Sequence, residues 1–396
     1  LDEVVRKILI SLSVGETVLE QTGLWFVLGY LMLLVVTGVW TLLARRYAPA
    51  GSATNSGFAQ LFLWLWLLLP ITLILGISYQ SPKFNPRYTL ISWPAFALIL
   101  ATALDSLHRP QISAPVLRIT QYLLRFALYA FILTTFSVSL LNWFTDPRFS
   151  KDDFQALAQF VRERKAADET VLLSSGHIFP VWAYYYGWDG WTPLPQMLRL
   201  DVNRVVDLSI ATQIDEALAD QNGVWLVTWQ DEVIDPNGVI PFWLDRIGKR
   251  PVDAGDFWGL GLEHWRLQPD KEERLAESPI VRPFQANFEK RLDLLGMTQL
   301  GDGELVLFWK PRRPLPDNLH VTLKLTDREG FHWGREEVIG RLGSDLYPPS
   351  RWPMDKTIIT RHELPWQIGT PPGLYVAEVG LGTVDESGQF GACLLY

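Results

Sequence analysis

The chain has 396 residues and a formal net charge of −8 at pH 7. This length is enough for two or three domains, and a net negative charge without a long lysine or arginine block argues against nucleic acid as a partner. The single cysteine, Cys393, excludes an intrachain disulfide and a metal cluster built from cysteines.

The mean hydropathy of +0.09 is high for a soluble protein and conceals a division within the chain. Residues 24–144 are strongly apolar, whereas the sequence from Thr145 onward carries charges throughout. We therefore expect a multi-domain membrane protein, in which a bundle of transmembrane helices precedes the globular domains.

Residues 1–23 form an amphipathic segment, because Ile8 and Leu12 belong to a set of apolar residues at helical spacing. We expect this segment on the outer membrane surface or against a preceding part of the protein. The chain begins with Leu1, and its first residues lack the pattern of a signal peptide. We interpret the sequence as the C-terminal part of a longer protein.

Four uncharged or nearly uncharged runs predict four transmembrane helices within residues 24–144. They cover residues 24–43, 58–77, 89–104 and 121–144. The second run contains Pro70, which membrane helices tolerate and which we expect to bend this one.

The positive charges of the short loops predict the orientation. The first and third loops carry Arg45, Arg46, Arg109 and Arg118, whereas the second carries Lys83 and Arg87. Four charges against two place the first and third loops inside, in a cell membrane that the chain crosses several times. The second loop and the globular domains are then extracytoplasmic.

The second loop, residues 78–88, places Lys83 and Arg87 at a membrane surface, directly before an apolar span. Two cations in this position could hold the phosphate of a lipid-linked substrate, and Arg87 suits the task better because a guanidinium can grip two phosphate oxygens. The alternative is that both residues only anchor a helix end among the lipid head groups.

Residues 145–275 alternate predicted helices and strands, which indicates a small α/β domain with a partly parallel sheet. Its first helix is expected to start at an N-cap formed by Ser150. The predicted strands are residues 170–174, 224–229 and 262–267, and the predicted helices include residues 180–187, 203–219 and 241–247.

After a charged linker at residues 269–283, the pattern changes to strands alone. Residues 283–396 predict an antiparallel β-sandwich. Its strands are expected at residues 288–295, 303–309, 319–326, 357–362 and 374–381, with a hairpin turn at residues 301–303.

An aromatic cluster lies in the α/β region and comprises Tyr184, Tyr185, Tyr186, Trp188 and Trp191. Tyr185, Trp188 and Trp191 are candidates for stacking on a sugar ring. The alternative is that the cluster packs in the core or docks against the membrane surface.

The six histidines are scattered without the spacing of metal ligands. We expect His320, His332 and His362 at the surface, and the alternative is that these three meet in the sandwich. We therefore assign no metal ligand and identify no cofactor, and the need for a divalent metal stays open.

Residues 85–104, with Arg87 and Tyr88, resemble the R-Y-L-L-P-x-x-P segment of dolichyl-phosphate-mannose protein mannosyltransferases, which belong to the C superfamily of glycosyltransferases. Ser92 stands where the first proline is common, and Pro94 keeps a proline nearby. Residues 152–186 are similar to the segment that follows the last span in bacterial members.

Residues 287–381 look like a β-sandwich that some bacterial members of this family carry. The matching motifs are Leu295-Gly296, Leu307-Phe308-Trp309, Tyr347-Pro348-Pro349-Ser350-Arg351-Trp352 and Pro372-Gly373-Leu374-Tyr375. Met354-Asp355 departs from the turn expected after the last tryptophan of the third motif.

The resemblance implies a polytopic membrane enzyme that transfers a sugar from a polyprenyl-phosphate lipid to an extracytoplasmic glycan or protein acceptor. It implies a donor-phosphate site at Lys83, Arg87 and Tyr88. Family members carry their catalytic carboxylate on the first outer loop, so no catalytic residue is assigned in this chain. The alternative function is a non-catalytic membrane-anchored protein whose outer domains bind a glycan or a protein.

Overall fold

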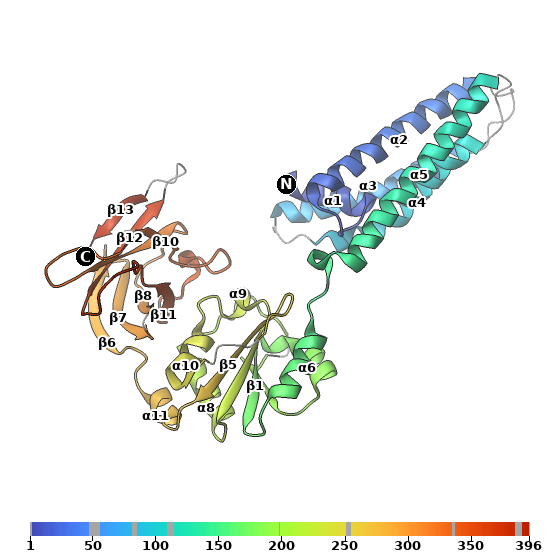
Figure 1. Cartoon of the computed structure of the whole chain (residues 1–396). Helices are drawn as coiled ribbons and strands as arrows, with labels where there is room; N and C mark the ends of the chain where they lie inside the picture. Colours follow the sequence, from blue (N-terminus) through green and yellow to red (C-terminus); the bar gives the residue numbers. More distant parts are fainter. Residues whose placement is uncertain are drawn as a thin grey trace. The chain divides into compact units, whose positions relative to one another are not determined.

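The chain divides into two compact units, a helical unit (Leu1–Ser150) and a C-terminal unit (Lys151–Tyr396). Figure 1 shows the order of their elements in a computed structural model. The structure describes residues 2–46, 56–80, 85–108, 115–197, 199–250, 255–301, 303–334, 337–384 and 390–395. A helical first part and a strand-rich second part agree with the order that the sequence predicts.

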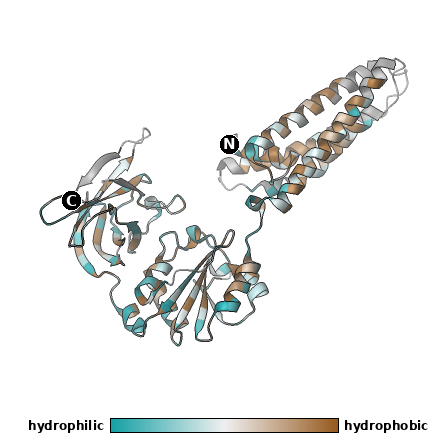
Figure 2. Ribbon diagram, in the orientation of Figure 1, coloured by the Kyte–Doolittle hydropathy of each residue, from teal (hydrophilic) through white to brown (hydrophobic). Residues whose placement is uncertain are grey.

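The helical unit is built from long apolar helices, which Figure 2 colours largely brown. Its elements are α1 (Asp2–Ser13), α2 (Glu20–Arg46), α3 (Ser56–Gln80), η1 (Pro86–Ser92), α4 (Trp93–His108), α5 (Pro115–Thr145) and η2 (Pro147–Phe149). Pro70 lies inside α3, which continues through it.

Three stretches among the described residues are long and apolar enough to cross a membrane. They are Phe58–Ile77, Arg87–Asp105 and Tyr122–Thr145, which correspond to the second, third and fourth predicted spans. In the region of the first predicted span, the described part of α2 contributes a shorter apolar stretch, Glu20–Val36. The described residues thus contain stretches of sufficient length and apolarity at three of the four predicted spans.

Helices replace most of the polar loop that the sequence predicts at residues 105–120, because α4 extends to His108 and α5 begins at Pro115. The third span starts differently from the prediction. Residues 86–92 form the 3₁₀ helix η1, and the α-helix begins only at Trp93. The side chain of Asn85 accepts a hydrogen bond from the backbone nitrogen of Arg87 at 2.9 Å, which fixes the start of η1.

The apolar face of α1 packs inside the helical unit itself. Ile8 and Leu12 are buried in one cluster with Leu67 of α3 and with Ala95 and Ile99 of α4. The described contacts of α1 therefore include neighbouring helices of the same chain, whereas the sequence suggested a membrane surface or a preceding part of the protein.

The first half of the C-terminal unit is a three-layer α/β arrangement. Its elements are α6 (Phe154–Arg164), β1 (Glu169–Ser174), η3 (Gly176–Ile178), α7 (Phe179–Tyr186), β2 (Trp191–Leu194), η4 (Leu208–Ile210), α8 (Ala211–Leu218), β3 (Gly223–Thr228), α9 (Asp231–Ile234), α10 (Val239–Ile247), β4 (Gly248–Lys249), β5 (Gly261–Leu267) and α11 (Lys271–Ala276). The sheet has the strand order β2-β1-β3-β5-β4.

The sheet is partly parallel, as predicted, because β1 runs parallel to β2 and β3 whereas β5 runs antiparallel to β3. Alternate residues of a strand point to opposite faces. Val171 and Leu173 accordingly pack with α6 and α7, whereas Leu172 packs with α8 and α10. Helices thus cover both faces of the sheet.

The second half of the C-terminal unit consists of two antiparallel sheets with a shared core. Its elements are β6 (Arg282–Phe288), β7 (Leu292–Leu300), β8 (Glu304–Pro311), β9 (Leu319–Thr326), β10 (Glu337–Arg341), η5 (Pro349–Arg351), β11 (Ile358–Glu363), β12 (Val376–Val384) and β13 (Phe390–Leu395). The sheets have the orders β10-β9-β12-β13 and β11-β8-β7-β6, and residues of both sheets form the cluster between them.

Strand β8 is buried on both faces. Leu305, Leu307 and Trp309 face the core between the two sheets, whereas Val306 and Phe308 pack into the α/β core beside α10. Ring contact between Phe308 and Phe242 of α10, at 5.8 Å between centroids, lies in this second layer. The α/β layers and the sandwich therefore form one compact unit.

Several predicted boundaries are wrong for local reasons. The N-cap of α6 is Asp153 rather than Ser150, and its carboxylate accepts from the nitrogen of Ala156. The helix predicted at residues 203–219 starts only after Asp207, whose extended backbone and side-chain bond to the nitrogen of Ser209 mark the start of η4.

Two further predictions fail near the junction between the two halves of the unit. The predicted linker at residues 269–283 contains α11, and Leu275 of this helix is buried in the α/β core. The predicted strand at residues 288–295 crosses a turn between β6 and β7, where Glu289 and Lys290 have positive φ angles. The side chain of Asn287 accepts from the nitrogen of Lys290 and stabilises this turn.

We expect Phe308→Ala to lower the free energy of unfolding of the C-terminal unit by about 3–5 kcal/mol, because it leaves a cavity in the layer beside α10. Phe284→Ala, a matched change at an exposed ring of β6, should alter it by less than about 0.5 kcal/mol. Denaturant titrations of the full chain in detergent, followed by tryptophan fluorescence, measure both values. Equal losses in the two variants would contradict the two-sided burial of β8.

Candidate functional site

The predicted donor-phosphate residues lie where the third span begins. Arg87 and Tyr88 are both exposed on η1, at the first residues of the apolar stretch Arg87–Asp105. Within the part of the chain that the structure describes, the guanidinium of Arg87 has no ion-pair or hydrogen-bond partner. Lys83 lies outside the described residues, so the structure does not test whether the two cations meet.

The orientation that the sequence predicts rests on side chains that are mostly not described. Arg109 lies outside the described residues, and so do the side chains of Arg45, Arg46 and Arg118. The inside and outside assignment of the loops therefore stays a prediction.

The aromatic cluster forms the surface of α7 and the segment after it. Tyr185 is 38% exposed and Trp188 is 72% exposed, whereas Trp191 is partly buried. Trp191 lies in β2, stacks on Phe179 at 6.5 Å, and donates from its indole nitrogen to the carbonyl of Gly187 at 2.9 Å. The structure thus places Tyr185 and Trp188 at the surface and gives Trp191 a packing role.

A hollow of about 640 Å³ lies on the surface of α6 and α7 and is lined by Gln155, Gln159, Arg162, Glu163, Tyr184 and Tyr185. Tyr184 and Tyr185 meet edge to face at 4.8 Å between ring centroids, and Tyr184 is 80% exposed. Trp188 and Trp191 are not part of its lining. We call this site the α6–α7 hollow.

The polar walls of the α6–α7 hollow are held in place by hydrogen bonds. Gln159 donates to the carboxylate of Glu163 at 2.9 Å, and Arg162 donates to the carbonyls of Tyr185 and Tyr186. An exposed aromatic ring beside amide and charged groups can stack on a sugar ring and hydrogen-bond its hydroxyls. The sequence singled out Tyr185 and predicted the helix that becomes α6, but gave no signal that the polar face of this helix lies beside the tyrosine.

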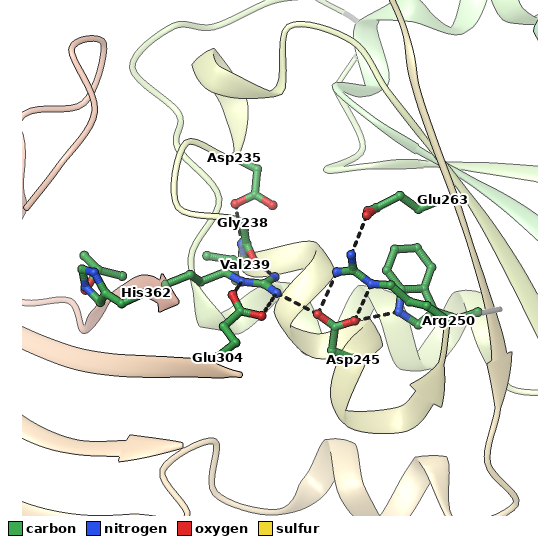
Figure 3. A network of polar contacts seen from close by, with 11 residues as sticks. Asp235, Gly238, Val239, Asp245, Arg250, Glu263, Glu304 and His362 are labelled. Carbon is green, nitrogen blue, oxygen red and sulfur yellow. Dashed lines mark hydrogen bonds and ion pairs between the residues drawn. The ribbon is translucent and has the colours of Figure 1, made fainter. Parts of the chain in front are cut away.

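A second hollow, of about 570 Å³, lies between the α9–α10 loop and the sandwich, and is lined by residues 236–238, 341–344 and 360–363. Arg361 is one of its lining residues and connects the two halves of the unit. Its guanidinium bonds Glu304 of β8 at 2.5 and 2.7 Å and Asp245 of α10 at 2.8 Å. Figure 3 shows the carboxylates of Glu304 and Asp245 on opposite sides of the guanidinium that they share.

Other groups hold Asp245 in place within this network. Arg250 donates to both of its oxygens at 2.8 Å, and the indole nitrogen of Trp265 donates to one of them at 2.9 Å. Burial lowers the pKa of Arg361, but the hydrogen bonds and charges of Glu304 and Asp245 outweigh it and raise that pKa overall. Arg361 therefore stays charged, and its charge is compensated on both sides.

Asp235 lies between α9 and α10 and is buried. Its two oxygens accept from the backbone nitrogens of Val239 and Ile240 at 2.7 and 2.8 Å. Burial raises the pKa of Asp235 to about 7, although these two bonds oppose the shift. The carboxyl satisfies donors that the first turn of α10 would otherwise leave unpaired.

His362 lies beside Arg361 and is buried, which contradicts the expectation that the histidines lie at the surface. The indole nitrogen of Trp309 donates to the hydroxyl of Thr360 at 2.7 Å, and that hydroxyl lies 2.7 Å from Nε2 of His362. Burial lowers the pKa of His362 to about 4, although the charge of Glu304 opposes the shift. His362 is therefore neutral at pH 7.

No group of three or more histidine, cysteine, aspartate or glutamate side chains that could hold a metal ion occurs among the described residues. Comparison of the chain with protein-family models, curated proteins and solved structures found no match. The resemblance to the mannosyltransferases is therefore a prediction that these comparisons leave untested.

We expect acid to destabilise the C-terminal unit through His362. In the unfolded chain this histidine takes up a proton near pH 6.5, whereas in the folded unit it stays neutral down to about pH 4. The resulting loss of stability begins as the pH falls through 6.5 and is complete below about pH 4, where it reaches about 3 kcal/mol.

The variant His362→Gln keeps an acceptor for Thr360 but removes this titration. Denaturant midpoints of the full chain at a series of pH values should therefore fall less steeply for the variant between pH 6.5 and 4. Parallel curves for the two proteins would show that His362 does not resist protonation.

Proposed function

We propose that this chain is part of a polytopic membrane glycosyltransferase that uses a polyprenyl-phosphate sugar as donor and a glycan or protein as acceptor. The observation that carries the proposal is the position of Arg87. It is exposed at the start of an apolar stretch of membrane-spanning length, and its guanidinium has no partner within the described residues. In a bilayer, lipid phosphates lie where the hydrocarbon region meets water, and the start of a membrane-spanning helix lies at the same depth.

Arg87 would contribute charge stabilisation to the transfer. Breaking the bond between the sugar and the lipid phosphate leaves negative charge on the phosphate, and a guanidinium stabilises it by paired hydrogen bonds. Tyr88 follows on the same turn of η1 and is 60% exposed, so its hydroxyl is available to a head group. In this proposal the C-terminal unit lies on the extracytoplasmic side.

We expect Arg87→Ala to weaken the binding of polyprenyl phosphate to the purified chain by about tenfold, because it removes charge-assisted hydrogen bonds to the phosphate. Arg87→Lys should lose less, since the charge remains and only the paired geometry is lost. Native mass spectrometry of the chain in detergent micelles measures the binding.

The matched control is Arg148→Ala, which removes an exposed arginine that already pairs with Asp146 at 2.6 Å. Its binding should equal that of the unaltered chain. If Arg87→Ala also binds unchanged, Arg87 only anchors a helix end, and the proposed donor site is wrong.

A second candidate function is glycan binding by the C-terminal unit, and the α6–α7 hollow favours it. Exposed tyrosine rings beside fixed amide and carboxylate groups suit a sugar that presents both a flat apolar face and hydroxyls. This surface could hold the acceptor of a transferase, or it could serve a membrane-anchored binding protein without catalytic activity.

We expect Tyr184→Ala to weaken the binding of soluble oligosaccharides by about fivefold through the loss of ring stacking, while Tyr184→Phe keeps most of it. Trp188→Ala removes a similarly exposed ring that does not line the hollow, and it should have little effect. Titration calorimetry with a panel of oligosaccharides measures all three. Equal losses for Tyr184→Ala and Trp188→Ala would place the site elsewhere.

A further inference from the structure

The segment that joins β11 to β12 exposes apolar side chains on the C-terminal unit. Residues 364–377, here called the apolar loop, contain no charged residue. Ile368 is 109% exposed, and Leu374 and Val376 are also largely exposed. Exposed apolar residues gathered on one loop commonly mark a contact with a partner or a lipid surface.

The apolar loop is held by its own contacts. Thr370 donates from its backbone nitrogen to the carbonyl of Gln367 at 3.1 Å, and its hydroxyl donates to the same carbonyl at 2.8 Å. Gly369 has a φ of +94°, which the third residue of this turn requires. The turn therefore directs Ile368 into solvent.

Two aromatic rings brace the base of the apolar loop. Trp366 and Tyr375 meet edge to face at 5.3 Å between centroids, and the hydroxyl of Tyr375 donates to the carbonyl of Pro371. Because Val376 of β12 pairs with Thr326 of β9, the loop after β9 leaves the sheet at the same end. That neighbouring loop adds Phe331, which is 60% exposed.

We propose that the apolar loop inserts into the interface of the bilayer that the chain's own helices cross. Tryptophan and tyrosine favour the level of the lipid head groups, and isoleucine and leucine favour the hydrocarbon below it. Because the loop contains no charged residue, its insertion does not require the desolvation of a charge. On the neighbouring loop, the charged residues Asp327, Arg328 and Glu329 precede Phe331, where they can stay among head groups.

The chain itself favours lipid over other occupants. Only residues 146–153 separate the end of α5 from the start of α6, so the C-terminal unit is permanently tethered to a span of membrane length. Tethering converts a weak surface contact into an intramolecular one with a high effective concentration. The α6–α7 hollow carries charged and amide groups and suits a wet ligand instead. The proposal requires membrane association but not the proposed sugar transfer.

The test uses the full chain in nanodiscs that each hold one copy, in equal parts of phosphatidylcholine and phosphatidylglycerol. In a Cys393→Ser background, Ile368→Cys carries an environment-sensitive fluorophore, and Asp317→Cys carries it in a control. Asp317 is exposed on the loop before β9, at the opposite end of that strand from Thr326. Because Ile368 is wholly exposed, its replacement removes no packing.

We expect brominated lipids to quench the label at position 368 by at least about twofold and to leave the label at position 317 unquenched. A label at position 368 that stays accessible to aqueous iodide and insensitive to brominated lipid would overturn the proposal. Shielding from iodide without quenching by lipid would also overturn it, because protein would then cover the loop. Equal quenching at both positions would show only unspecific contact with the bilayer.

Discussion

The burial of β8 on both faces organises the C-terminal unit. A strand with one apolar face needs one partner layer, but the run from Leu305 to Trp309 offers apolar side chains to both sides and must be covered twice. One side receives the second sheet of the sandwich, and the other receives α10 and the α/β core. The sandwich therefore cannot separate from the α/β layers without exposing Val306 and Phe308 to water.

The ionic bridge of Arg361 follows from the same packing. Once α10 lies against β8 and β11, Asp245 and Glu304 approach from two elements, and a charge between them must be compensated because desolvating it alone costs several kcal/mol. Arg361 meets this need with paired hydrogen bonds to Glu304 and a further bond to Asp245. A partly buried ion pair of this kind adds little net stability, because desolvation offsets much of the attraction between its charges.

The two proposed ligand sites and the apolar loop lie in separate parts of the chain and differ in chemical character. Arg87 offers charge at the start of an apolar helix, the α6–α7 hollow offers aromatic rings beside polar groups, and the apolar loop offers only hydrophobic surface. These surfaces suit a phosphate, a sugar and a lipid respectively. Under the two proposed functions, a transferase would use Arg87 and the α6–α7 hollow, and a glycan-binding protein would use the hollow alone.

The sequence by itself determined the elements whose signals are local. Uniform apolarity predicted the spans, and strand-like runs predicted β1, β3, β5 and β9. Only the tertiary structure decided which elements meet. Arg361 and Asp245 are 116 residues apart, and no local pattern encodes their contact or the burial of His362 beside it. The sequence predicted the strand at residues 303–309 but not that both of its faces are buried, because its covering layers come from distant segments and hydrophobic periodicity carries no information about them.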